Sequence, residues 1–173
     1  MGIPMASRRR PSLTTRAWTF RQTMVSTSVL SPFVRLTKDS RLLHGARPVA
    51  LDIHRDPRGE LGVLDASAML PFAINRLFYI RPSDPPHTRG NHACSVPQVA
   101  MAMAGHVVFD LDNGRDRQSI EMASPSVGLL IAAGVWLQMH DFSPDAVVLV
   151  AAPERYAHMR HFDRAQPELI DFA

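Results

Sequence analysis

The segment Arg89-Gly90-Asn91-His92-Ala93-Cys94 places a guanidinium, an imidazole and a thiol close together in the chain. Side chains in a β-strand alternate between two faces, so His92 and Cys94 would share one face, joined by Gln98 if the strand continues. An imidazole with an ordinary pKa near 6.5 suits a general base at neutral pH. A thiol relays a proton, or acts as a nucleophile where its pKa is lowered. The alternative is that both side chains are buried for packing.

Four further residues are candidates for the same site. Tyr79, at the end of the preceding strand, carries a phenol that donates or accepts a proton. Arg81 and Arg89 flank the loop that opens this face, and the guanidinium fork suits a phosphate group, although a solvated loop charge is the alternative for each. Trp136 is suited to stack on a base or sugar, with core packing as its alternative. We therefore expect substrate contacts from Arg81, Arg89, Gln98 and Trp136.

The sequence alone does not supply a complete set of metal ligands. A protein metal site needs three or four ligands, of which His92 and Cys94 supply two. Gln98 stands where a carboxylate would be wanted, and the strand after Gly134 offers no ligand until His140. We therefore predict proton transfer without a metal and without any cofactor, and a metal-binding barrel remains the less favoured alternative.

Short β-strands are the elements that must position these residues. Hydrophobic and β-branched runs recur about every 8–12 residues with turn residues between them, a pattern typical of a sandwich or barrel. Asn113-Gly114 is the best hairpin signal in the chain. From Pro153 onward the sequence predicts one short helix or irregular structure. We expect strands over residues 49–53, 60–64, 76–80, 98–104, 106–111, 118–122, 127–132, 135–139 and 146–151.

The charges of the 173-residue chain are unevenly distributed. Residues 1–38 hold seven basic residues and no acidic one, which leaves 12 basic and 16 acidic residues, a net of −4, in residues 39–173. We therefore expect a flexible basic extension over residues 1–38 and one barrel domain over residues 39–173. Residues 1–30 also have the composition of a targeting segment, and a start at Met24 is a further alternative.

The composition excludes several classes of protein. With 46% hydrophobic and 20% charged residues, the chain is typical of a globular domain and not of a disordered or fibrous one. One cysteine excludes a disulfide framework within the chain. No apolar run reaches the roughly 18 residues of a membrane span, and the acidic body gives no general reason to bind nucleic acid. We expect neither a membrane nor a nucleic-acid partner.

Residues 47–151 resemble the nucleotide-sugar 3,4-ketoisomerases of the FdtA and QdtA type, the WxcM-like cupins. The order and spacing of the matching pieces carry the resemblance. They are Asp56-Pro57-Arg58-Gly59 with Leu61, Pro71-Phe72, Arg76-Leu77-Phe78-Tyr79-Ile80, Arg89-Gly90-Asn91-His92-Ala93, Gln98, Gly105, Asp112-Asn113-Gly114, Gly128-Leu129, Trp136 and Asp141-Phe142-Ser143.

The resemblance implies an all-β cupin barrel of the jelly-roll type, a cytoplasmic homodimer and no required metal. It implies isomerisation of a dTDP-linked 4-keto-6-deoxy sugar to the 3-keto form, through an enediol, in the biosynthesis of deoxysugars for surface polysaccharides. His92 matches the first histidine of the family's Arg-Gly-x-His-Ala-His motif, which is thought to take the proton beside the ketone. Tyr79 matches a strand tyrosine thought to assist, and Arg89 matches the arginine that opens the motif.

The chain departs from the family pattern at three places. Cys94 stands where the family has its second histidine, and Ser95 stands where a lysine is usual. Residues 156–162 only loosely match the family's Tyr-Asp-Glu-x-Asp-Tyr pattern. The loss of one imidazole keeps two alternatives open, namely an epimerase on a related keto sugar and a cupin that binds a nucleotide sugar without turnover.

Overall fold

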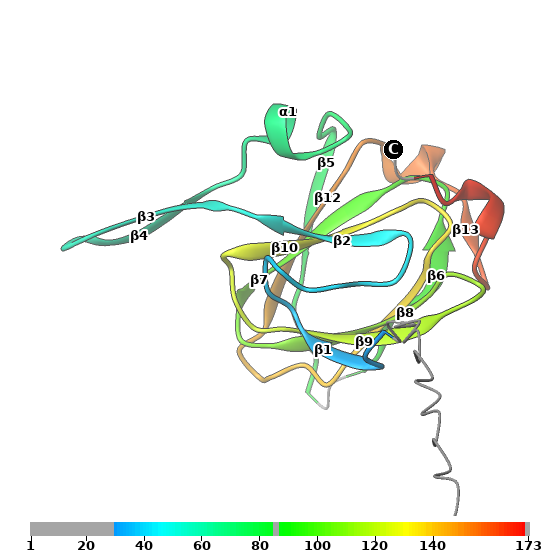
Figure 1. Cartoon of the computed structure of the whole chain (residues 1–173), viewed down its shortest axis with the longest axis horizontal. Coiled ribbons are helices and arrows are strands. Elements are labelled where there is room, and N and C mark those ends of the chain that lie inside the picture. The colour runs from blue at the N-terminus through cyan, green and yellow to red at the C-terminus, as the bar shows by residue number, and fades with distance from the viewer. Residues whose placement is uncertain (1–29, 85–86, 172–173) are drawn as a thin grey trace, which may run out of the picture.

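The computed structural model describes residues 30–84 and 87–171, and within these ranges the chain is almost entirely β-structure. Two sheets face each other and form a barrel (Figure 1). One sheet has the strand order β1 (Phe33–Arg35), β9 (Arg117–Met122), β8 (Val107–Asp112), β11 (Trp136–His140), β6 (Arg89–Cys94) and β13 (His161–Phe162). The other has the order β2 (Ala46–Ala50), β10 (Val127–Ile131), β7 (Gln98–Ala104), β12 (Val147–Ala152) and β5 (Arg76–Ile80).

The path of the chain identifies the barrel as a jelly roll of the cupin type. From β5 onward, successive strands alternate between the two sheets, and the β8–β9 hairpin is the exception within the described residues. All strand pairs of the two sheets are antiparallel apart from β1 with β9. Alternation between two packed sheets distinguishes a jelly roll from an up-and-down barrel. The predicted all-β cupin fold is therefore confirmed.

The hydrophobic core lies between the two sheets. Inward-facing side chains of both sheets meet there because alternate residues of each strand point to the same face. Burial of a leucine, isoleucine or phenylalanine side chain contributes about 1.5–3 kcal/mol, so this layer is the main source of stability. Its largest fully buried members include Phe109, Leu111, Ile120, Leu129 and Val148.

A third sheet, of two strands, projects from the barrel. It consists of β3 (Asp52–Asp56) and β4 (Gly59–Val63), and Figure 1 shows it extending away from the body as an arm. The predicted turn at residues 56–59 connects the two strands. The short helix α1 (Ala66–Met69) follows, and its N-cap is Asp65, whose carboxylate accepts a hydrogen bond from the Ser67 amide.

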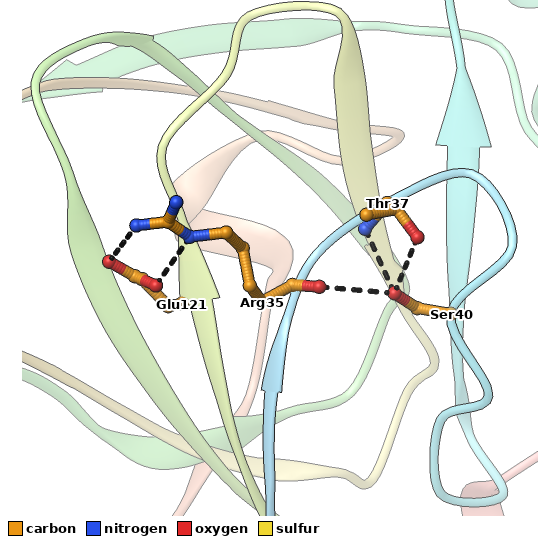
Figure 2. Close-up of polar contacts among 4 residues, drawn as sticks. All are labelled: Arg35, Thr37, Ser40 and Glu121. Atoms are coloured by element: carbon orange, nitrogen blue, oxygen red, sulfur yellow. Dashed lines mark hydrogen bonds and ion pairs between the residues drawn. The ribbon is translucent and has the colours of Figure 1, made fainter.

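The first described residues pack against the barrel. In β1, Val34 pairs with Ile120 of β9, and Leu36 is buried. Figure 2 shows a two-point ion pair, in which the Arg35 guanidinium contacts the Glu121 carboxylate at 2.8 and 3.0 Å. The expected flexible extension over residues 1–38 therefore ends too late, because residues 30–38 are held by backbone pairing and burial. Residues 1–29 lie outside the described part of the chain.

A hydroxyl closes the turn that follows β1. The Ser40 side chain accepts a hydrogen bond from the Thr37 amide at 2.8 Å and donates one to the Arg35 carbonyl at 3.3 Å (Figure 2). These two hydrogen bonds satisfy backbone groups where the chain leaves the sheet. The chain then continues to Leu43, which is buried.

From residue 60 onward the expected strands agree closely with the observed ones. The single strand expected over residues 49–53 is wrong, because β2 ends at Ala50 and β3 begins at Asp52. Three further elements, β1, α1 and β13, were not predicted, and they are only two to four residues long. The Asn113-Gly114 hairpin is confirmed, with Gly114 at φ +85° and the Asn113 carboxamide accepting hydrogen bonds from two following amides. After β12 the chain forms two short 3₁₀ helices, η1 (Tyr156–His158) and η2 (Pro167–Leu169), on either side of β13.

None of the helices in residues 30–84 and 87–171 is long and apolar enough to cross a membrane.

Candidate active site

A cavity of about 170 Å³ lies between the two sheets, at the end of the barrel where β13 joins β6. Its base is apolar, with contributions from Phe109, Leu137 and Val150. Its volume is below the roughly 300–1,000 Å³ of pockets for drug-sized ligands and equals about six water molecules. A single sugar ring is therefore the size of group that suits it. Its polar lining consists of Arg76, Arg89, His92, Gln98, Tyr156 and His161.

A β-bulge orients His92 in this cavity. The register between β6 and β11 shifts, so that His92 pairs with Leu137 and Gly90 pairs with Gln138, which leaves Asn91 as the extra residue. Gly90 and Asn91 both have positive φ, at +79° and +63°. A Cβ on Gly90 would lie 2.5 Å from the Leu137 side chain, so glycine is required there.

The bulge also fixes the tautomer of His92. It brings the Gly90 carbonyl oxygen to 2.8 Å from His92 Nδ1. A carbonyl oxygen only accepts hydrogen bonds, so the neutral ring carries its proton on Nδ1. Nε2 therefore keeps its lone pair and is free to accept a proton from a substrate.

Cys94 lies on the same face of β6 as His92, as predicted, but its thiol is not activated. It is 5% exposed, and burial raises its pKa to about 11, while the charge of Arg76 acts in the opposite direction. The Gln98 amide donates to its sulfur at 3.5 Å, even though β7 is a separate strand and not a continuation of β6. A protonated, buried thiol is unsuited to nucleophilic attack at neutral pH.

His161 is a second imidazole at this site, although its place in the sequence favoured only a surface or capping role. In the antiparallel pairing of β13 with β6, His161 is the direct partner of Cys94. Its ring meets that of His92 edge to face, with centroids 4.5 Å apart. Burial, and then the charges of His92 and Arg76, lower the pKa of His161, so its ring is neutral at pH 7. The site therefore has two imidazoles despite the cysteine in the motif.

Ser95 fastens the short strand that carries His161. The Ser95 amide donates to the Arg160 carbonyl at 2.9 Å, and the Arg160 amide donates to the Ser95 hydroxyl at 2.9 Å. Both departures from the family motif, Cys94 and Ser95, thus contact the segment that brings His161 to the cavity. Only the loose match of residues 156–162 to the family pattern signalled this segment, because His161 is remote from His92 in the sequence.

Two arginines give the cavity a positive rim. Arg76 lies over the rings of Phe78 and Tyr156, with its guanidinium carbon 4.3 and 5.0 Å from their centroids. It also contacts the Met159 sulfur at 3.3 Å. Arg89, which was predicted to contact substrate, lines the cavity as well. One guanidinium group donates two parallel hydrogen bonds to two oxygens of a phosphate, so this rim suits an anionic ligand.

Three predicted site residues lie elsewhere. In β5, Phe78 and Ile80 line the cavity, so alternation turns Tyr79 to the opposite face, where it is 69% exposed. The structure thus places this phenol outside the chain's own cavity. Arg81 follows β5 as an exposed residue and does not line the cavity. In β11 the same alternation turns Trp136 outward.

The outward face of the larger sheet has an open groove of about 570 Å³. Trp136 lines it, together with Arg117, Gln138 and Arg164. Unlike the lining of the smaller cavity, the lining of this groove contains no imidazole, so we assign the chemistry to the smaller cavity. Trp136 can stack on a ligand only in the outer groove.

A jelly-roll barrel with a sugar-sized cavity, two adjacent imidazoles and an arginine rim defines a cupin-type enzyme suited to proton transfer on a small anionic substrate. Comparison with known families makes the assignment specific. The family described as "FdtA: WxcM-like, C-terminal" matches residues 44–165, and the chain belongs to it.

Similar proteins are sugar ketoisomerases. The chain is 37% identical over 112 residues to the TDP-4-oxo-6-deoxy-α-D-glucose-3,4-oxoisomerase of Aneurinibacillus thermoaerophilus, covering 62% of this chain and 81% of that protein. A variant of the 3,4-ketoisomerase QdtA from Thermoanaerobacterium thermosaccharolyticum, in complex with TDP-4-keto-6-deoxyglucose, superposes with a TM-score of 0.63 at 33% identity, covering 66% of this chain and 84% of that one. The WlaRB TDP-quinovose 3,4-ketoisomerase from Campylobacter jejuni superposes with a TM-score of 0.62 at 34% identity, covering 66% and 88%.

Proposed function

We propose that this protein isomerises a dTDP-linked 4-keto-6-deoxy sugar to its 3-keto form. The pair of imidazoles, His92 and His161, at one sugar-sized cavity is the observation that carries the proposal. The names of the similar proteins support the substrate class, since one of them holds TDP-4-keto-6-deoxyglucose. The reaction moves a proton between adjacent carbons and needs no group beyond acid–base catalysts.

The two imidazoles divide the proton transfers. Nε2 of His92 takes the proton from C3, and the C4 oxygen gains a proton, which gives an enediol. The C3 hydroxyl then loses its proton and C4 gains one, so that the ketone moves to C3 and the atoms of substrate and product balance. His161 is near enough to exchange the hydroxyl protons while His92 serves the carbons. Because its pKa is lowered, its neutral ring can accept a proton at pH 7.

The arginine rim supports the anionic part of the substrate. The cavity accommodates only the sugar ring, so the diphosphate must lie at its opening, where Arg89 offers a guanidinium. Arg76 lies nearer to the imidazoles, since its charge acts on both Cys94 and His161. Its position suits stabilisation of the negative charge that develops on the enediol oxygens.

The reaction places the protein between two other classes of reaction, in a cytoplasmic route to deoxysugars. A 4,6-dehydration of a nucleotide hexose supplies a 4-keto-6-deoxy sugar, and an amination at C3 consumes a 3-keto product. The product of such a route is an amino sugar for a surface polysaccharide.

The experiment that tests the proposal follows the sugar by proton NMR in deuterated water. The purified full-length protein should convert dTDP-4-keto-6-deoxyglucose to a 3-keto isomer with deuterium on the ring. Tight binding without deuterium incorporation would instead indicate a nucleotide-sugar binding protein without turnover. Deuterium incorporation with the ketone still at C4 and an inverted neighbouring carbon would indicate an epimerase.

We also propose that the protein works as a homodimer. Large apolar side chains are exposed on the projecting arm and on the outward face of the edge strand β5, where Leu61 is 61% and Leu77 60% exposed. Exposed apolar side chains of this size are typical of interaction surfaces. Light scattering should give twice the chain mass for the wild type. Leu77→Lys should shift it toward the monomer, and Arg117→Ala, on the groove of the other sheet, should not.

A further inference from the structure

Three side chains that bind transition metals converge beside the cavity, where His92 and His161 line it and Cys94 is buried behind them. One ligand atom each from His92, Cys94 and His161 lies within 4.8 Å of the other two. Ligands around a tetrahedral zinc ion lie about 2.0–2.3 Å from the metal, so small rotations of these side chains bring all three to one centre. The structure thus supplies the third ligand that the motif lacked.

The neighbours of two ligands favour coordination. A metal-binding histidine normally donates its other N–H to a carbonyl or carboxylate, and His92 Nδ1 already does so to the Gly90 oxygen at 2.8 Å. This leaves Nε2 as the metal-binding atom. The Gln98 amide, which donates to the Cys94 sulfur at 3.5 Å, would stabilise a thiolate there.

Binding would release one proton, because a cysteine ligand holds a metal ion as the thiolate. The guanidinium of Arg76 opposes a cation nearby, but within the described part of the chain its contacts are with the rings of Phe78 and Tyr156 and the Met159 sulfur.

We propose that His92, Cys94 and His161 form a binding site for Zn²⁺. Two imidazoles and one thiolate are a ligand set for a borderline-soft ion and not for Mg²⁺ or Ca²⁺. Because His92 and His161 line the cavity, the fourth position faces its interior and is open to water or substrate. Zinc at Nε2 of His92 removes the lone pair that accepts the substrate proton, so, where the proposed isomerisation holds, zinc inhibits it reversibly.

Binding is measured on the full-length protein, freed of metal by a chelator, with Zn²⁺ alone as the ligand. Competition with a chromophoric chelator should give one tight site per chain. Cys94→Ser and His161→Gln should each weaken it at least about a hundredfold, and His158→Gln, on the neighbouring 3₁₀ helix, should leave it unchanged. His158 is a matched control because it is exposed and outside the cluster.

Cobalt(II) provides a second measurement that does not depend on activity. Bound to the wild type, it should show a thiolate-to-metal charge-transfer absorption that Cys94→Ala lacks, and circular dichroism should show that the variant is folded. Zinc affinity that is equal in wild type, Cys94→Ser and His161→Gln would place the ion on exposed histidines and overturn the proposal, as would the absence of a tight site. Failure of isomerisation would leave these binding results unaffected.

Discussion

His161 is the residue that directly faces Cys94 across the antiparallel pair of β13 and β6. Directly opposed residues in such a pair have side chains on one face, with Cβ atoms about 4.5–5.5 Å apart. An imidazole on β13 therefore lies opposite the position at which the family motif has its second histidine. The cavity keeps two titratable rings, and their separation from each other is set by the sheet.

His92 is expected to be the principal base. His92→Asn removes the lone pair at Nε2 while the carboxamide retains a hydrogen-bond donor near the Gly90 carbonyl. General acid–base catalysis contributes about 10²–10⁴-fold, so kcat should fall by at least a hundredfold. Deuterium incorporation into the ring should fall in parallel, measured by NMR. Undiminished exchange in a folded variant would show that another group takes the proton.

His161 is expected to assist, with a smaller effect. His161→Gln should lower kcat by about 10–100-fold and leave KM for the nucleotide sugar within a fewfold, because the diphosphate contacts lie at the cavity opening. The matched control is His158→Gln, an exposed histidine of the preceding helix, which should retain full activity. Equal losses in the two variants would indicate disturbance of the C-terminal segment and not the loss of a catalytic group.

Hydrophobic alternation and turn residues predicted most of the barrel from the sequence. The strands β5 and β7 were predicted with their observed bounds, because each is a run of apolar residues between turn residues. The short strand β13 has two residues and no period to detect. It forms because Ser95 and Arg160 exchange hydrogen bonds, which is a long-range contact that a local pattern does not contain.

The site was only partly predictable for the same reason. His92 and Cys94 lie two apart on one strand, so period-two geometry placed them together. The same geometry separates Tyr79 from the cavity, since its neighbours Phe78 and Ile80 line it, and resemblance to a motif does not reveal which face of a strand points inward. His161 was missed because its proximity to His92 depends on the path of the chain after β12.

The two tyrosines of the chain provide a test of this placement. Both are exposed, at 65% for Tyr156 and 69% for Tyr79. Tyr156 lines the cavity, with its ring centroid 5.3 Å from that of His161, whereas Tyr79 lies on the outer face of β5. Tyr156→Phe should lower kcat severalfold, because it removes a hydroxyl from the lining. Tyr79→Phe should leave kcat within twofold. A large loss with Tyr79→Phe in steady-state assays would show that its hydroxyl reaches a catalytic site in the assembled protein.

The buried thiol predicts a specific dependence of stability on pH. Burial raises the pKa of Cys94 from 9.0 to about 11. Below about pH 8 the thiol is protonated in both the folded and the unfolded chain. As the pH rises from 9 through 11, the unfolded chain loses its proton first, so the free energy of unfolding falls, by roughly 3 kcal/mol at the limit.

Urea unfolding of wild type and Cys94→Ala at pH 7, 9 and 10.5 measures this effect. The wild type should lose more stability than the variant between pH 9 and 10.5, because other groups titrate equally in both proteins. Parallel pH profiles would contradict a raised pKa. Iodoacetamide should also alkylate the folded wild type only slowly at pH 7, in agreement with a thiol that is 5% exposed.

Ser95 is expected to act on catalysis only through the position of His161. Ser95→Ala removes the hydroxyl that accepts a hydrogen bond from the Arg160 amide, a contact worth about 1 kcal/mol. The backbone bond from the Ser95 amide remains, so β13 should loosen without unfolding of the barrel. We expect kcat to fall by up to about tenfold and Ser95→Thr to restore it, since threonine keeps the hydroxyl.

In the His161→Gln background, Ser95→Ala should have no further effect on kcat, because two changes that act through one imidazole are not additive. Additive losses in that double variant would show that Ser95 has a role independent of His161.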